Sequence, residues 1–351
     1  MDPTTLQIVW FALICVLWTG YLLLEGFDFG VGALLRVLGR ERNERRALLN
    51  TFGPVWDGNE VWLLVAGGAT FAAFPEWYAT LFSGFYLALF VLLVAIIVRN
   101  IGIEFWGKDE DSRWKDVWEW AIVVGSILPA VLLGVAWANL AHGIPLAADG
   151  EFAGNFWTLI NPYALLGGVT TLLLFCAHGT HFLGLRLHGV LRERADAAAR
   201  LLAPAAAVAL VLFAGWTVLL QSPVEALSAA VAAVAVLAAA GAAYVVYARR
   251  LGEGWTFGLS SLAIAALFAS IWIWQFPNAL RSTNAATHMT LAEASSSPYT
   301  LKVMTWVAVA LVPFVLLYQG WTYWVFRRRI GAEDFAPGAT PLDALGSKSH
   351  G

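Results

Sequence analysis

The feature that most constrains this chain is a succession of long apolar runs. Nine runs of about twenty mainly apolar residues follow one another along its 351 residues, and a helix needs a run of that length to cross the hydrocarbon core of a membrane. Charged residues make up only 13% of the chain, about half the share that is usual in a soluble domain. The sequence therefore predicts an all-α polytopic membrane protein.

The runs place one integral-membrane domain over residues 1–330 and leave 331–351 as a tail that we expect to be disordered. No soluble domain is predicted. The predicted spans are 6–35, 51–74, 76–99, 117–141, 160–185, 201–220, 224–248, 256–276 and 301–326.

The loops between these spans predict an orientation, because Lys and Arg gather on the cytoplasmic side of membrane proteins. Of the 21 Lys and Arg residues, all but Arg281 and Lys302 fall into alternate loops or the tail. Nine spans with this alternation place the N-terminus outside the cell and the C-terminus in the cytoplasm. A missed or added span would scramble the alternation.

Composition excludes several other functions. The net charge of -3 and the scattered basic residues argue against a nucleic-acid partner. Cys15 and Cys176 both lie inside apolar runs, so we predict two buried thiols and neither a disulfide framework nor a thiolate metal site.

Four acidic residues interrupt the first two spans. Glu25 and Asp28 lie three residues apart in one span, and Asp57 and Glu60 lie three apart in the next, so each pair shares one helix face. Counted from Arg36 and Arg46 at the helical rise, the four lie roughly 12 to 21 Å from the inner surface. Because a charge at this depth is costly, such residues face the protein interior and usually have a function.

Three interpretations of these carboxyl groups stay open. Crowded carboxyl groups in a poorly solvated site cannot all ionise easily, so we expect at least one to keep its proton near neutral pH. They could then relay protons, or they could act structurally by hydrogen bonding to neighbouring helices. A site for a hard cation with oxygen ligands is the third interpretation.

Glycines and histidines complete the set of candidate residues. Gly26, Gly30 and Gly58 are expected to allow close helix packing. His178 and His181 lie three residues apart in the fifth span, so they project from one side of a helix and cannot hold the two faces of one haem. Each could still ligate a haem singly with a partner elsewhere. Hydrogen bonding or contact with a cofactor propionate is the interpretation that we favour, and we expect no metal or haem ligand in this chain.

Several segments resemble subunit II of the cytochrome bd-type quinol oxidases. They are GFDFGVGALLR, followed by a run of arginines, then WDGNEVWLLVAGGATFAAFP, GNFWTLINPYALLGG and TLKVMTWVAVALVPFVLLYQGWTYW. The resemblance implies two four-helix bundles plus one peripheral helix, in a multi-pass protein of the bacterial cell membrane. It also implies a partner subunit I that carries haems of the b and d types, and it permits small accessory membrane subunits.

The implied complex oxidises quinol and reduces dioxygen to water with protons taken from the cytoplasm. In that setting this chain is a non-haem subunit that is not catalytic alone, and Asp28 and Asp57 become candidates for a proton path toward subunit I. The second acid of the WDGN motif is Glu60, where other members carry Gln. A structural quinone or lipid between the bundles is a further hypothesis.

A stand-alone secondary transporter that couples to ions through the same acids is the alternative function. Transporters of this kind often contain inverted repeats with broken helices at corresponding places. The sequence contains no such pair, and we favour the oxidase subunit chiefly on the family resemblance.

Overall fold

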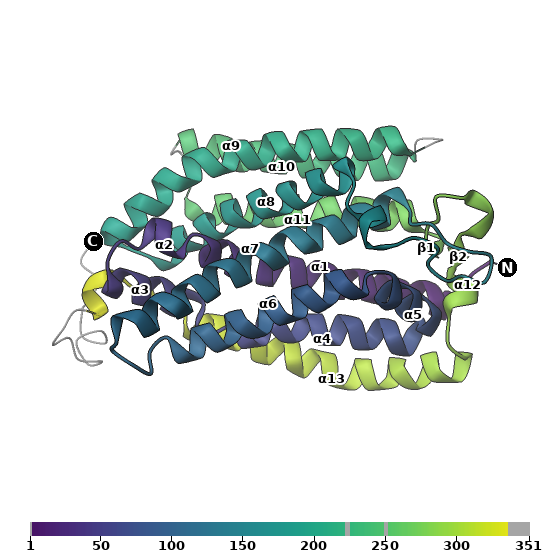
Figure 1. The fold of residues 1–351 in the computed structure, drawn as a ribbon, viewed down its shortest axis with the longest axis horizontal. Helices are drawn as coiled ribbons and strands as arrows, with labels where there is room; N and C mark the ends of the chain where they lie inside the picture. Colours follow the sequence, from purple (N-terminus) through teal and green to yellow (C-terminus); the bar gives the residue numbers. More distant parts are fainter. Residues whose placement is uncertain (1, 222–224, 249–251, 336–351) are drawn as a thin grey trace.

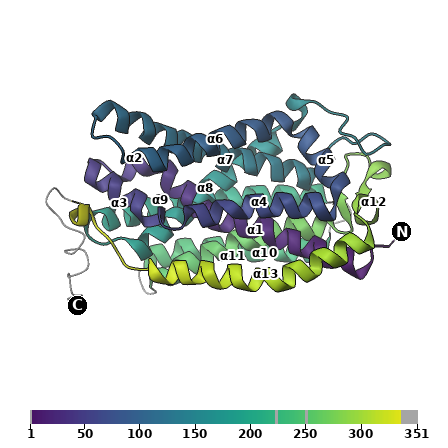
Figure 2. The same ribbon diagram turned by 90° about the horizontal axis from the view of Figure 1, so that it is seen from below.

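Long helices run side by side along the longest axis of the molecule (Figure 1). The computed structural model describes residues 2–221, 225–248 and 252–335. Helix α1 begins at one end of the molecule, and the last described residues lie at the opposite end (Figures 1 and 2).

The long helices account for most of the described chain. They are α1 Thr5–Ala33, α4 Trp56–Ala73, α6 Tyr86–Phe105, α7 Ser112–His142, α8 Pro162–Arg186, α9 Gly189–Leu220, α10 Ala226–Ala248, α11 Glu253–Gln275 and α13 Pro298–Val325.

Short elements gather at the two ends. Helices α2 (Leu35–Leu38) and α3 (Arg42–Phe52) lie at the end where the described chain finishes, near the 3₁₀ helix η3 (Ala332–Phe335). The other end carries α5 (Pro75–Gly84), α12 (Leu291–Ala294) and two further 3₁₀ turns, Phe156–Leu159 and Ala285–Thr287. Strands β1 (Asn278–Leu280) and β2 (Met289–Thr290) form an antiparallel pair there.

Helix α1 lies at the centre of the packing. It contacts α4, α7, α8 and α11, while α8, α9, α10 and α11 also pack against neighbours within their own group. Helix α13 contacts α1 and α4 along the outside, and most of its side chains are exposed. The charged pair of residues in α1 is therefore surrounded by other helices.

Among the described residues, eight helices are long and apolar enough to cross a membrane. Helix α4 is not one of them, because Asp57, Asn59 and Glu60 in its first turns lower its hydropathy. The structure therefore shows a polytopic helical protein, and the ninth crossing stays a prediction.

Helix bounds differ from the predicted spans at several points. The span predicted at 76–99 is divided at Phe85 into α5 and α6, and α6 continues to Phe105. Helix α9 begins at Gly189 rather than near 201. Part of the tail expected to be disordered forms η3, and residues 336–351 lie outside the described residues.

Candidate functional site

A buried arginine joins two of the predicted acidic residues. Arg99 of α6 lies with its Nη1 atom 2.5 Å from Glu25 Oε1 of α1 and 3.5 Å from Glu60 Oε2 of α4. The side chains of Arg99 and Glu25 are fully buried, and that of Glu60 is 12% exposed. Because both glutamates reach the same guanidinium, they lie at one level of the helix bundle.

Aromatic rings surround this charged group. The guanidinium carbon of Arg99 lies 4.8 Å from the ring centre of Phe29 and 5.9 Å from that of Phe52. The hydroxyl group of Tyr21 donates a hydrogen bond to Glu60 Oε1 at 3.3 Å. Cation–π contacts gain strength when water is excluded, so the rings hold the guanidinium in place.

Asp28 belongs to an adjoining hydrogen-bond network. Its Oδ2 atom accepts a 2.8 Å hydrogen bond from Nδ2 of Asn59, and both residues are fully buried. Asn59 Oδ1 in turn accepts from the hydroxyl group of Tyr323 at 2.7 Å and from Nε2 of Gln319 at 3.2 Å. The network ties α1 and α4 to the peripheral helix α13.

The arrangement has spare proton-binding capacity. Glu25, Asp28 and Glu60 supply three carboxyl groups around the single guanidinium of Arg99, so the group is neutral only when two carboxyl groups carry protons. Glu25 Oε1 is paired with Arg99, whereas Glu25 Oε2 and Asp28 Oδ1 make no hydrogen bond to the described residues. Buried polar atoms normally find a partner, so these oxygens are open to protons or water. We call Glu25, Asp28, Glu60 and Arg99 the carboxyl–arginine cluster.

Asp57 does not join this cluster. It lies on the exposed face of α4, together with Gly58. Apart from the adjoining residues and backbone of α4 itself, no described heavy atom lies within 4 Å of the place where a Cβ of Gly58 would stand, so no other described helix packs closely on Gly58. Two side chains three residues apart on a helix point in directions that differ by about 60°. This difference is enough to leave Asp57 exposed while Glu60 is half-buried.

Gly26 and Gly30 lie at a close approach of α1 and α8. A Cβ on Gly26 would come within 2.8 Å of the Phe175 ring, and one on Gly30 would overlap the Phe175 carbonyl oxygen. On the facing helix, a Cβ on Gly179 would lie 2.8 Å from the backbone of Gly30. The two backbones pack directly against each other beside the cluster.

Sequence reasoning missed Arg99 as a site residue. The predicted span ended at residue 99, so Arg99 counted among the basic residues of an inner loop, whereas α6 continues to Phe105 and carries Arg99 into the interior. Four acids in two neighbouring spans require a cation nearby, and that requirement is the signal that could have identified it.

His178 of α8 is held by contacts within the protein. His178 Nδ1 lies 2.7 Å from Ser260 Oγ, and its ring stacks on Phe257 with centroids 4.6 Å apart. Both cysteines are free. Within the described part of the chain, no group of three or more His, Cys, Asp or Glu side chains is placed to hold a metal ion.

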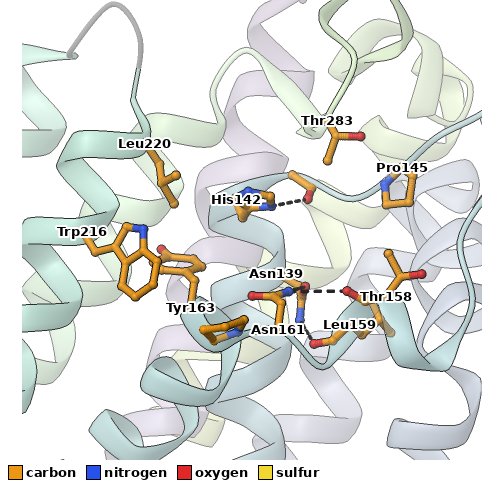
Figure 3. Close-up of a pocket in the computed structure, with 12 residues that line it drawn as sticks. Asn139, His142, Pro145, Thr158, Leu159, Asn161, Tyr163, Trp216, Leu220 and Thr283 are labelled. Carbon is orange, nitrogen blue, oxygen red and sulfur yellow. Dashed lines mark hydrogen bonds between the residues drawn. The ribbon is translucent and has the colours of Figure 1, made fainter.

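A separate cavity of about 340 Å³ opens near the end of the molecule where α7 finishes and α8 begins (Figure 3). Its amide groups bond within the protein: Asn139 Nδ2 donates to the Leu159 carbonyl at 2.8 Å, and Asn161 Nδ2 donates to Asn139 Oδ1 at 3.0 Å. These amides hold the start of α8, and the cavity does not contain the acidic residues.

Comparison with known proteins gives consistent results. The sequence model of the family described as "Cytochrome bd terminal oxidase subunit II" matches residues 6–326. The chain is 40% identical over 337 residues to "Cytochrome bd ubiquinol oxidase subunit 2" of Bacillus subtilis, with 94% of this chain and 98% of that protein covered. It is 37% identical over 369 residues to "Cytochrome bd-I ubiquinol oxidase subunit 2" of Escherichia coli strain K12, with 95% and 97% covered.

The fold is also similar to a chain in a solved structure described as "The structure of bd oxidase from Geobacillus thermodenitrificans". The TM-score is 0.75 at 15% sequence identity, and the alignment covers 92% of this chain and 99% of the other. At that identity the likeness concerns the fold alone.

Proposed function

The chain belongs to the cytochrome bd terminal oxidase subunit II family, and we propose that its carboxyl–arginine cluster passes protons from the cytoplasmic side toward the partner subunit of the oxidase. As a family member it is a multi-pass protein of the bacterial cytoplasmic membrane and a subunit of a quinol oxidase, an oxidoreductase of the respiratory chain. The stand-alone transporter is set aside on this membership.

The proposed topology has nine crossings, with the N-terminus outside. Helix α4 supplies the ninth crossing, because it packs against α1, contacts α13 and holds Glu60 against Arg99. The long helices fit the 4 + 4 + 1 arrangement. One group of four contains α1, α4, α6 and α7, the second contains α8, α9, α10 and α11, and α13 lies outside both. Basic residues such as Arg36, Arg45 and Arg194 lie near the described C-terminal end and support its placement in the cytoplasm.

The proposed proton route is supported by one observation: Arg99, which is buried, contacts the carboxyl groups of buried Glu25 and half-buried Glu60, and buried Asp28 lies one helical turn from Glu25 on α1. Such a group can gain or lose a proton while its charge stays between neutral and singly negative. A relay needs this property in a membrane interior, where isolated charges are costly. Oε2 of Glu25 and Oδ1 of Asp28 are the positions at which the proton would move.

Asp57 is the proposed point at which protons leave this chain. It is exposed on α4 beside apolar side chains that are exposed as well, including Val61 (44%) and Leu64 (69%). A carboxylate is poorly tolerated against lipid, so we propose that subunit I covers this face and receives protons there. The b- and d-type haems of the complex would then lie in subunit I, with small accessory subunits and a structural quinone or lipid placed elsewhere on the surface.

The structural alternative assigns the acids only to helix pairing, and it makes a different prediction. We would replace Asp57 with Asn in the assembled two-subunit complex, then measure haem content and quinol oxidase turnover. The relay requires normal haem content with reduced turnover. Full turnover with normal haem content would reject a relay through Asp57, and loss of haem would favour the structural role.

A further inference from the structure

A second cavity, of about 280 Å³, lies among α8, α9, α10 and α11 at the end that we place in the cytoplasm. It is separate from the carboxyl–arginine cluster, and none of the cluster residues lines it. The residues that line it are Thr180, His181, Gly184, Arg192, Asp196, Ala199, Arg200, Val245, Val246, Glu253 and Thr256.

His181 lies in the wall of this cavity with both ring nitrogens unbonded. The residue is 3% exposed, and neither Nδ1 nor Nε2 has a hydrogen-bond partner among the described residues. A neutral imidazole has one N–H donor and one acceptor nitrogen, and a buried polar group of this kind normally bonds to protein or ordered water. The cavity is the space from which such a partner can come.

The size and lining of the cavity suit water. At roughly 30 Å³ per molecule, a cavity of this volume accommodates several waters, and a buried water needs two to four polar partners. The hydroxyl groups of Thr180 and Thr256 donate to the carbonyls of Ala177 and Glu253 at 2.7 Å each, so their oxygens still accept hydrogen bonds.

The charges around the cavity balance. Glu253 of α11 pairs with Arg192 of α9 and, at 3.0 Å, with Arg329 beyond α13. The lining contains two positive side chains, Arg192 and Arg200, and two negative ones, Asp196 and Glu253. The cavity therefore needs no bound ion to balance its charge. The ionisable groups that face His181 or adjoin it along α8 are Arg192, Asp196 and Arg200 of α9, Glu253 of α11, and His178 and Arg186 of α8 itself.

We propose that this cavity is a water-filled intake at the cytoplasmic end of the second helix group, in which His181 exchanges protons with bulk water. His181 accepts a proton from a cavity water at its free nitrogen to become the imidazolium cation, and it returns to the neutral form when the proton passes on. It thus provides the oxidase with an inner-side proton group that is distinct from Glu25, Asp28 and Glu60. The inference rests on the proposed cytoplasmic placement of this end.

Hydration is tested first, without changing His181. Both native cysteines, Cys15 and Cys176, are first replaced by Ala. One variant then carries Thr256→Cys in the cavity wall, and the matched control variant carries Ser270→Cys. Ser270 is also buried on the same helix, 2% exposed against 8% for Thr256, but does not line the cavity. The intact complex in inside-out vesicles is treated with a charged, membrane-impermeant methanethiosulfonate. We expect the Thr256→Cys complex to react at least about tenfold faster, because thiol reactivity depends on access and ionisation. Equally slow labelling of the Thr256→Cys and Ser270→Cys complexes would overturn the proposal. That result is also the one expected if a lipid blocks the cavity.

Proton exchange is tested with His181→Gln, which keeps a hydrogen-bonding side chain but cannot carry a proton. In complexes with normal haem content, we expect turnover above pH 7 to fall at least about tenfold, in the range of effects seen when a proton-transfer group is removed. A pH profile identical to the parent would overturn the role of His181 even if the cavity is wet. If His181→Gln lowers the haem content, His181→Asn is measured in the same way. Asp28 lies outside this cavity, so an Asp28→Asn complex with normal proton uptake would reject the cluster route and leave this inference intact.

Discussion

Arg99 Nη1 lies 2.5 Å from Glu25 Oε1 at a point where neither side chain is exposed. The contact joins α6 to α1 and places a permanent positive charge beside three carboxyl groups. A buried ion pair of this kind adds little net stability over an apolar pair, but removal of one partner leaves an unpaired buried charge. The pair therefore offsets part of the negative charge of the cluster more than it strengthens the fold.

Replacement of Arg99 with Gln should prevent stable assembly. The loss of the guanidinium leaves three carboxyl groups without a cation, at an expected cost of roughly 3–5 kcal/mol. Arg99→Lys keeps the charge but loses the planar fork and the ring contacts, so it should be milder. The yield of haem-loaded complex and its thermal unfolding midpoint measure both effects. An Arg99→Gln complex as stable as the parent would show that the cluster does not need its cation.

Gly30→Ala should weaken the packing of α1 on α8. The new methyl group would overlap the Phe175 carbonyl oxygen, and backbone atoms cannot move aside as a flexible side chain can. Overpacking of this kind typically costs about 1–3 kcal/mol. Gly258→Ala in α11 is the control, because no described heavy atom lies within 4 Å of that position. Thermal unfolding should separate the two variants, and equal behaviour would mean that α1 and α8 do not need this close approach.

Stability at acid pH should depend on Glu44. Burial opposes its ionisation, but hydrogen bonds from Arg194 and from the backbone N–H groups of Glu41 and Arg40 outweigh burial, so the pKa of Glu44 lies below its ordinary value of 4.5. Because the folded state holds the proton less tightly than the unfolded state, the stabilisation is complete above about pH 4.5. It is lost as the pH falls through the lower, folded pKa.

Unfolding midpoints of the parent and of Glu44→Gln between pH 3 and pH 7 test this dependence. The parent should lose its advantage over the variant as the pH falls. A constant difference across the whole range would show that the Arg194–Glu44 contact carries no charge-dependent stability.

The sequence predicted the helical architecture well, because long apolar runs in a membrane leave few alternatives to helices. It located helix ends less well where a helix leaves the apolar zone. Helix α9 begins at Gly189, about twelve residues before the predicted span, because residues 189–200 continue the helix with polar side chains that hydropathy excludes. The break at Phe85 between α5 and α6 likewise leaves no mark in a continuous apolar run.

The candidate site was predicted in part. The shared level of Glu25 and Glu60 followed from residue spacing, and both contact Arg99 in the structure. The rotation of α4 could not be deduced, so Asp57 was expected to join the group although it faces outward. Arg99 could not be distinguished from a surface arginine, since a basic residue near a predicted span end has the same sequence pattern whether it is exposed or paired.

Proton uptake by an Asp28→Asn complex tests the proposed route through the carboxyl–arginine cluster. The amide can still accept the hydrogen bond from Asn59, so the fold and haem content should be preserved while the carboxyl proton is lost. After oxygen is added to the fully reduced complex, a pH indicator on the cytoplasmic side should report uptake slowed at least about tenfold, in keeping with the removal of a proton-transfer group. Uptake at the parent rate in a fully assembled complex would contradict the account.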